Sequence, residues 1–220
     1  MKSASSSSQA VEKLRSLIFT GKLGAGSDHL ESELAGVLGM SRTPVREALL
    51  VLEGQGLVDV RPRKGVRIKP LSPADMAEIY DVLTELESLA ARNAANAHYT
   101  QGELALLSSC IDEMDRTLRA EDREGWAKAD DEFHAELVRL GNNSRVSAIV
   151  SMMSDQVRRA RLVTLHMRPL PTRSNADHRK LYEALRTGDA DAAHRMHHAH
   201  RSETKDVLIE LLRKHHLNSV

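Results

Sequence analysis

Cysteine and aromatic residues are scarce in this chain of 220 residues. It has one cysteine, Cys110, and aromatic residues make up 3% of the sequence. A single cysteine excludes a fold held by internal disulfides and is typical of a reducing compartment, so we expect a cytoplasmic protein. The small number of aromatic and β-branched runs, beside abundant Ala, Leu, Glu and Arg, favours a mainly α-helical fold.

Long apolar runs are also missing. No stretch approaches the roughly 20 apolar residues that a membrane-spanning helix needs, so we expect no membrane partner. Residues 1–8 are rich in serine and have no apolar centre. They are therefore unlike a secretory signal peptide and are predicted to form a disordered tail. Hydrophobic residues still make up 41% of the chain, which is enough to build one or two cores.

The chain has no net charge, but the two signs are unevenly distributed. Residues 1–70 contain 11 Lys and Arg against 7 Asp and Glu, a balance of +4, and residues 71–220 have the opposite balance of −4. Ten of the eleven histidines also lie in the second part. Pro70 and Pro73 interrupt any helix at the boundary. We therefore predict two domains, 9–70 and 71–220, of which the first has an anionic partner.

The first domain has the pattern of a winged helix-turn-helix. Apolar spacing predicts three helices and two short strands, at about 9–20, 31–38, 43–53, 57–61 and 66–69. Gly39 supplies the turn between the second and third helices. The second helix is expected to bury Leu34, Val37 and Leu38. The two strands flank Pro62-Arg63-Lys64-Gly65, which predicts a hairpin with a basic tip.

The third of these helices carries side chains suited to a DNA duplex. Arg42 and Arg46 are four residues apart and project from one face, at the helix end that meets base edges in helix-turn-helix docking. Arginine pairs bidentately with guanine, and the hydroxyl groups of Ser41 and Thr43 can reach phosphates. The hairpin would add contacts from Arg63, Lys64 and Arg67. The alternative is an ordinary helical domain with arginines on a solvated face.

Residues 32–52 resemble the N-terminal domain of the GntR family of bacterial transcription regulators, most specifically in the run SRTPVREAL at 41–49. Gly56-Leu57-Val58, followed by Gly65, is similar to the wing of that family. The resemblance implies operator binding at double-stranded DNA through Ser41, Arg42, Thr43 and Arg46, with Gly65 at the wing tip. The chain departs from the family at Ser32, where members often have arginine, and at Leu50 and Val51, where polar residues are common.

The second domain is predicted to be a bundle of about six helices. Helical patterns with short breaks between them cover about 73–97, 102–120, 124–140, 143–167, 173–187 and 189–215. Short connections favour antiparallel neighbours. The last helix is expected to present an apolar stripe at Val207, Leu208, Leu211 and Leu212.

Asp130 and His134 have the spacing of a chelating pair. Four residues apart on a helix, they place a carboxylate and an imidazole on the same face. Two more imidazoles could come from later helices, one from His178 and one from the cluster His194, His197, His198 and His200. Three imidazoles and one carboxylate suit a divalent transition metal such as Zn, Ni or Mn. The alternative is an exposed polar contact beside a solvated, histidine-rich helix.

Residues 73–215 resemble the FCD ligand-binding domain, the C-terminal module of the FadR branch of the GntR family. The resemblance rests on Asp-x-x-x-His in DDEFHAEL, a histidine in DHRKLYEALRTGDA and a third in HHAHRS. It implies a divalent metal held by Asp130, His134, His178 and His200. His200 is chosen because it lies twelve residues after Gly188, and His197 is the runner-up.

The same resemblance implies a small organic acid as effector, held by the metal and by an arginine. Arg158 and Arg161, three residues apart on one predicted helix, are the candidates to pair with its carboxylate. Surface arginines near one end of the bundle are the alternative. Many members have arginine where this chain has Leu83, so its effector is expected to be less acidic or held differently.

Together these features predict a ligand-responsive transcription regulator, a repressor, that acts as a homodimer on a palindromic operator. Two alternatives stay open. A metalloenzyme could use the same Asp and His residues, although no general base or nucleophile motif accompanies them. A constitutive DNA-binding dimer could hold the metal for its structure alone.

Overall fold

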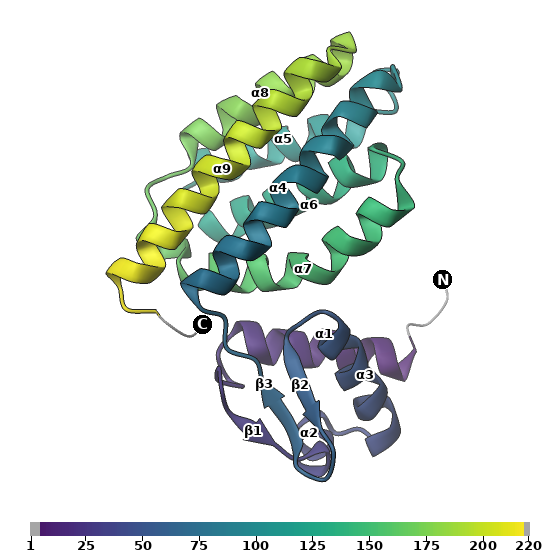
Figure 1. Cartoon of the computed structure of the whole chain (residues 1–220), viewed down its shortest axis with the longest axis vertical. Coiled ribbons are helices and arrows are strands. Elements are labelled where there is room, and N and C mark those ends of the chain that lie inside the picture. Colours follow the sequence, from purple (N-terminus) through teal and green to yellow (C-terminus); the bar gives the residue numbers. More distant parts are fainter. Residues whose placement is uncertain (1–4, 218–220) are drawn as a thin grey trace.

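The N-terminal domain consists of helices packed against a small sheet (Figure 1). The structure is a computed structural model that describes residues 5–217. Within them α1, α2 and α3 span Ser6–Phe19, Glu31–Leu38 and Arg42–Gly54. Strands β1, β2 and β3 span Asp28–His29, Val58–Arg61 and Gly65–Ile68, pair antiparallel, and lie in the order β1-β3-β2. This arrangement is the predicted winged helix-turn-helix, with an additional strand, β1, at the sheet edge.

The helix-turn-helix forms where the sequence places its apolar residues and its glycine. Gly39 ends α2 in the left-handed conformation, with φ of 64°, which glycine adopts without steric cost. The core side of α3 is as predicted, because all four of its expected residues are buried: Val45, Ala48, Leu49 and Leu52. The expected burial of Val37 is wrong, since this side chain is 65% exposed. The face of α2 that packs on the core is centred on Leu34, Ala35 and Leu38, and Val37 lies about a quarter turn away from it.

The first helix begins earlier than the sequence pattern suggested. Residues 6–8, expected in the disordered tail, form the first turn of α1, because the side chain of Ser5 accepts a hydrogen bond from the backbone N–H of Ser8 and caps the helix. Residues 1–4 of that tail lie outside the described residues.

The second domain is the expected antiparallel helical bundle. Helices α4 to α9 span Pro73–Asn96, Ala105–Arg119, Arg123–Leu140, Ser144–Val163, Thr172–Thr187 and Ala190–Lys214. The helix predicted over 143–167 ends at Val163, and a short 3₁₀ turn, η1 (Leu165–Met167), follows before Pro169 and Pro171. Figure 1 shows the long helices α4 and α9 side by side along the bundle. Among the described residues, we find no helix with both the length and the hydropathy for crossing a membrane.

The wing is joined to the bundle by a short, well-capped connection. Ser72 caps α4 by accepting from the backbone N–H of Asp75, and the Asp75 carboxylate accepts from the backbone N–H of Ser72. Pro73 occupies the first helical position, where its missing N–H costs nothing. Residues 69–72 therefore link β3 directly to α4 of the bundle.

Helix α7 lies along α1, so the two domains are in direct contact (Figure 1). Arg15 on α1 donates to the carboxylate of Asp155 on α7 at 2.8 Å, and both side chains are largely buried. Arg159 donates to the carbonyl oxygen of Lys69 at 2.7 Å. The guanidinium of Arg158 lies over the ring of Phe19 at 5.5 Å. Polar and cation–π contacts from one face of α7 thus attach the N-terminal domain to the bundle.

Candidate functional site

The residues predicted to contact DNA lie on the surface at the start of α3. The side chains of Ser41, Arg42, Thr43 and Arg46 are all exposed. Arg42 is 72% exposed, and its nearest acidic group is the carboxylate of Glu31 at 3.9 Å. Because Val45 between them is buried in the core, the helix is fixed while these polar side chains point outward. The structure thus brings the predicted residues of the third helix together on one face.

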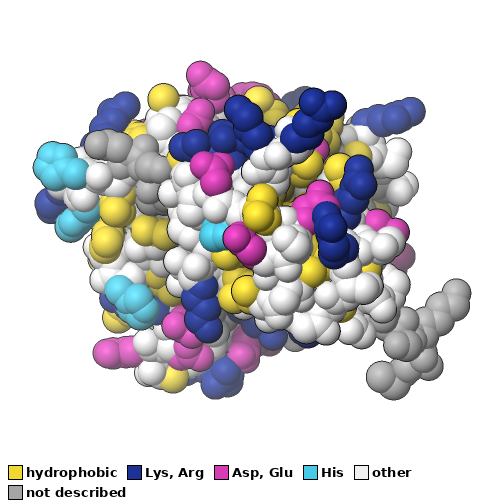
Figure 2. Space-filling model, turned by 90° about the horizontal axis from the view of Figure 1, so that it is seen from below, with side chains coloured by type: hydrophobic (Ala, Val, Ile, Leu, Met, Phe, Trp, Pro, Cys, Tyr) yellow, Lys and Arg dark blue, Asp and Glu magenta, His cyan; other side chains and the backbone are white. Residues whose placement is uncertain are grey.

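The wing places further basic groups at the same end of the molecule. Arg63 and Lys64 are exposed at the turn between β2 and β3. Figure 2 views the molecule from this end and shows Lys and Arg side chains interrupted by acidic ones rather than in one continuous patch. Gly65 has a role that the sequence did not reveal: its φ is 87°, and a Cβ there would lie 2.2 Å from the carbonyl oxygen of His29. Glycine is therefore needed at this position for strand pairing with β1.

The four predicted metal ligands converge inside the bundle. Asp130 and His134 come from α6, His178 from α8 and His200 from α9. Nitrogen atoms of the three histidines lie within 4.8 Å of one another. Asp130 Oδ1 is 3.6 Å from His178 Nε2, and Asp130 Oδ2 is 3.9 Å from His134 Nε2. Helices α6, α8 and α9 thus bring three imidazoles together, with the Asp130 carboxylate beside two of them, His134 and His178.

Several polar atoms in this cluster have no hydrogen-bond partner. Asp130 Oδ1 and both ring nitrogens of His178 are buried, and none of the residues that the structure describes forms a hydrogen bond with them. Because a buried polar atom without a partner costs free energy, such atoms call for a ligand. A divalent metal fits them: it would be bound by Asp130 Oδ1 and by neutral imidazole nitrogens.

The charge states of the cluster suit a metal ligand set. Burial opposes the ionisation of Asp130, but the Arg161 guanidinium, which donates to Oδ2 at 2.5 Å, and the neighbouring imidazoles hold its pKa below the ordinary value. Burial lowers the pKa of His178 to about 3. The carboxylate is therefore ionised and the imidazole neutral at pH 7, which are the forms that bind metals.

A second group of buried side chains adjoins the first through His134. Glu87 on α4 and His197 on α9 lie on the side of His134 that carries Nδ1. His197, the runner-up among the predicted ligands, is thus placed next to the cluster rather than in the set around Asp130. Arg201 stands 3.3 Å from Glu87 Oε1. Burial works against the charge of Glu87, yet Arg201 and the two imidazoles lower its pKa to about 2.

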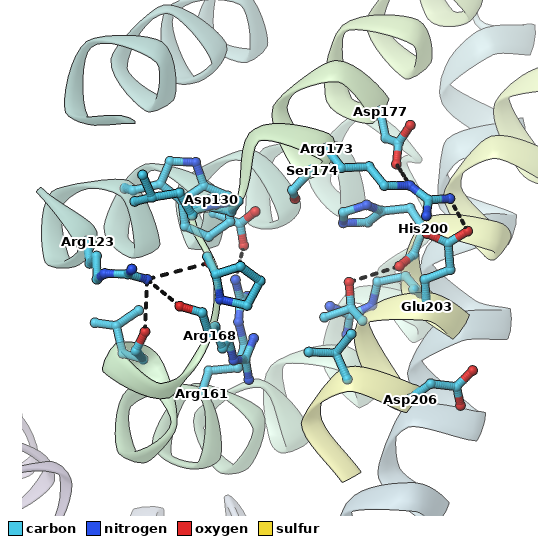
Figure 3. Close-up of a pocket in the computed structure, with 18 of the residues that line it drawn as sticks. Arg123, Asp130, Arg161, Arg168, Arg173, Ser174, Asp177, His200, Glu203 and Asp206 are labelled. Carbon is cyan, nitrogen blue, oxygen red and sulfur yellow. Dashed lines mark hydrogen bonds and ion pairs between the residues drawn. The ribbon is translucent and has the colours of Figure 1, made fainter. Parts of the chain in front are cut away.

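A cavity of about 440 Å³ opens beside the Asp130 cluster (Figure 3). Asp130 and Arg161 lie on one wall, and His200 and Glu203 from α9 lie on the opposite wall. Apolar groups complete the lining, among them Trp126, Leu165, Leu170 and Val207. Val207 was expected on the buried stripe of the last helix, but it is 42% exposed. It lies seven residues from His200 and so shares the cavity face of α9.

The two arginines predicted to bind an effector have different surroundings. Arg161 is buried, lines the cavity and is paired with Asp130 and Asp131. Arg158 does not line this cavity. It is half exposed, 3.3 Å from Asp131, and lies over Phe19. Arg158 and Arg161 together line a smaller cavity of about 160 Å³ next to Glu87 and His134, and only Arg161 also lines the larger one. The expectation that both bind an effector stays a prediction.

Sequence reasoning missed Arg168, which lies in the segment after η1. This side chain lines the cavity, and its guanidinium donates to the hydroxyl oxygen of Thr164. No carboxylate of the described residues forms an ion pair with it, and burial together with the nearby Arg161 lowers its pKa to about 10. Arg123 donates to the backbone carbonyl of Arg168 and so fixes this segment. The only signal in the sequence was an arginine beside Pro169, in a stretch predicted to be the end of a helix.

Comparisons with known families agree with the two domains. Residues 6–68 match the family described as bacterial regulatory proteins of the gntR family, and residues 78–203 match the FCD domain. An "Uncharacterized HTH-type transcriptional regulator in unstable DNA locus" of Streptomyces ambofaciens is 33% identical over 92% of this chain and 84% of its own length. A "Probable D-xylose utilization operon transcriptional repressor" of Paenarthrobacter nicotinovorans is 30% identical over 80% of this chain and 76% of its own.

Solved structures show the same fold. The Escherichia coli protein McbR/YncC superimposes with a TM-score of 0.79 at 22% identity, over 94% of this chain and 99% of that one. A GntR family member from Pseudomonas syringae gives a TM-score of 0.57 at 27% identity, over 96% and 88%. A winged helix-turn-helix joined to an FCD domain defines a transcription regulator rather than an enzyme. The chain belongs to the GntR family of bacterial regulatory proteins, in the group with a C-terminal FCD domain.

Proposed function

We propose that this regulator is a homodimeric repressor that binds a divalent transition metal and a small organic acid in its bundle, and that the acid changes its affinity for a palindromic operator. The convergence of Asp130, His134, His178 and His200 beside an arginine-lined cavity carries the proposal. DNA recognition is assigned to the start of α3 and to the wing, namely Ser41, Arg42, Thr43, Arg46, Lys64 and Gly65.

The metal would be Zn, Ni or Mn, held by the four side chains of the Asp130 cluster. When bound, it supplies a Lewis-acidic position that a carboxylate oxygen can occupy. Neighbouring residues orient the ligand side chains. Arg161 donates a hydrogen bond to Oδ2 of Asp130, so the other oxygen, Oδ1, is directed at His178. The ring of Phe133 packs against His178 at 4.5 Å between centroids and restricts its rotation.

The effector is assigned to the acid class because of the cations in the cavity wall. Arg161 is already neutralised by two carboxylates, whereas Arg168 has no acidic partner among the described residues. A partly buried arginine that forms no ion pair with the described carboxylates favours an anionic ligand. Apolar groups such as Trp126 and Leu165 line the rest of the space, which suits the carbon skeleton of such an acid.

Helix α7 offers a direct path from the cavity to the DNA-binding domain. Its residue Arg161 meets Asp130 in the cavity, while Asp155 and Arg159 on the same helix hold α1 and the end of the wing. A change in the position of Arg161 would therefore move the contacts of Asp155. In a two-fold dimer, that shift alters the separation of the two recognition helices, which must match operator half-sites about one helical turn apart.

Thermal unfolding tests the sensing part of this proposal. The metal-stripped protein would be heated with Zn²⁺ alone and then with Zn²⁺ and members of a series of small carboxylic acids. We expect Zn²⁺ to raise the melting temperature and one or more acids to raise it further only when Zn²⁺ is present. A ligand at 100 times its Kd stabilises the native state by about 2.7 kcal/mol.

Two matched variants locate the acid in the cavity. Arg168→Met is expected to keep the response to Zn²⁺ and to lose the response to the acid, whereas Arg158→Met, outside the cavity, keeps both. If no acid shifts the melting temperature of the zinc-loaded protein, sensing of an organic acid is contradicted. A protein that Zn²⁺ stabilises without any response to acids would instead be a constitutive regulator with a structural metal.

A further inference from the structure

Glu87, His134 and His197 meet at three nearly equal distances. Glu87 Oε2 is 3.3 Å from His134 Nδ1 and 3.4 Å from His197 Nε2, and the two nitrogens are 3.4 Å apart. The side chains come from α4, α6 and α9, so three separate helices supply one atom each. All three residues are buried. The three atoms thus form an almost equilateral triangle inside the bundle.

These distances are long for hydrogen bonds and right for metal ligands. Charge-assisted hydrogen bonds between nitrogen and a carboxylate are about 2.7–2.9 Å long. Ligand atoms placed about 2.0–2.1 Å from a tetrahedral zinc ion lie roughly 3.3–3.4 Å from one another. The triangle therefore matches one face of a tetrahedral coordination shell more closely than it matches a hydrogen-bond network.

The carboxylate oxygen at one corner of this triangle points to a ligand independently. Glu87 Oε2 is buried and has no hydrogen-bond partner among residues 5–217, and the Glu87 side chain is only 5% exposed. Arg201 stands by the other oxygen, Oε1, and so leaves Oε2 directed at the two imidazoles. A cation bound between this oxygen and the two ring nitrogens would satisfy Oε2, which Arg201 does not reach.

We infer that Glu87, His134 and His197 form a second site for a divalent transition metal, with Zn²⁺ as the best-fitting ion. His134 faces this site with Nδ1 and faces Asp130 with Nε2. A neutral imidazole carries one N–H. To offer a nitrogen to an ion at each site, His134 would have to release this proton to solvent. The second site goes beyond the proposed function, because its ligand triangle does not include the Asp130 carboxylate or His178.

The competing explanation is that Glu87 only orients His134. Carboxylates commonly hold the second ring nitrogen of a metal-bound histidine and raise the affinity for the metal. If Glu87 only orients His134, each chain binds one metal ion and His197 is not a metal ligand. The number of ions bound per chain therefore separates the two explanations.

Zinc stoichiometry of the full chain tests the inference. The protein would be stripped with a chelator, loaded with Zn²⁺ alone, freed of excess by gel filtration and measured by elemental analysis. We expect two zinc ions per wild-type chain and one in His197→Gln. The matched control is His198→Gln, the neighbouring exposed histidine on α9, which is expected to retain two. Circular dichroism shows whether each variant is folded.

Glu87→Gln is a second test variant, which preserves the volume of the side chain. Like His197→Gln, it is expected to bind one zinc ion per chain. Two ions retained in both His197→Gln and Glu87→Gln overturn the inference. One ion in the wild type that persists in His197→Gln also overturns it and leaves Glu87 as an orienting residue. One ion that is lost in His197→Gln but kept in His178→Gln supports the second site and contradicts the Asp130 site of the proposed function instead.

Discussion

At the scale of single residues, the two proposed binding surfaces differ in how their side chains are held. Arg42 and Arg46 project from a helix whose inner face is packed, and they have little contact with the rest of the domain. Asp130 and His178 are almost fully buried and are held from several sides. Substitution of the first pair should affect DNA binding with little effect on stability, whereas substitution of the second pair should affect both metal binding and packing.

Replacing Arg46 with alanine should weaken binding to a duplex selected by the wild-type protein from a random library. Loss of a bidentate arginine–guanine contact costs about 1–3 kcal/mol, or roughly 5- to 150-fold in Kd. Fluorescence anisotropy measures the Kd, with Arg116→Ala as the control, an exposed arginine on α5 that pairs with Glu113. Equal affinities for wild type and Arg46→Ala would remove Arg46 from the interface.

Replacing His178 with alanine should lower the zinc bound at the Asp130 cluster. The reason is that His178 Nε2 is buried, unpaired and 3.6 Å from Asp130 Oδ1. Elemental analysis of the purified variant checks this, with the exposed His166→Ala as the control. Unchanged zinc content in His178→Ala would exclude this residue as a ligand.

At the scale of helices and strands, much of the structure follows from patterns that are local in the sequence. Gly39, the apolar face of α3 and the spacing of Asp130 and His134 each act within one element, and each was predictable. Strand β1 was not, because a two-residue strand has no periodicity and exists only through pairing with β3. The need for glycine at position 65 has the same origin, since it depends on the approach of His29.

The cap of α4 should contribute measurably to stability. Removing the Ser72 hydroxyl with Ser72→Ala is expected to lower the free energy of unfolding by about 1 kcal/mol. Ser41→Ala is the matched control, because Ser41 precedes α3 without a side-chain capping hydrogen bond. Urea denaturation measures both, and similar losses in the two variants would contradict the capping account.

The same cap gives an expected dependence on pH. Hydrogen bonds from Ser72 lower the pKa of Asp75 below the ordinary value of 3.8. A carboxylate with a lowered pKa stabilises the folded state above its ordinary pKa, and this contribution is lost as the pH falls through the folded value. The difference in stability between wild type and Ser72→Ala should therefore be full at pH 7 and shrink below about pH 4. A difference that stays constant down to pH 3 would argue against Asp75 as the partner.

At the scale of the whole molecule, the sites depend on contacts between distant segments, and here the sequence was least informative. The roles proposed for Glu87 and Arg168 could be inferred only once α4, α9 and the segment after η1 were placed around α6. Arg158 and Arg161 look equivalent in sequence, yet one faces α1 and the other faces the cavity. The resemblance predicted a ligand set around Asp130, which stays a prediction, whereas the direction of each side chain along α7 could be seen only in the packed structure.

The contact between α1 and α7 should show energetic coupling. Arg15 and Asp155 are both largely shielded from solvent and lie 2.8 Å apart. A double-mutant cycle with Arg15→Ala and Asp155→Ala is expected to give a coupling free energy of about 1 kcal/mol, at the upper end for ion pairs near a surface. Urea denaturation measures the free energy of unfolding of the wild type, the two single variants and the double variant. If the effects of the two substitutions on this free energy are strictly additive, the pair does not join the domains.

The most direct test of the account is the Kd of the zinc-loaded protein for its selected operator, measured with and without a saturating concentration of an acid that raises its melting temperature. The account predicts that the acid changes this Kd at least fivefold, which corresponds to a coupling of about 1 kcal/mol, and that the change disappears in Arg168→Met. An acid that binds the bundle but leaves the operator Kd unchanged would contradict it.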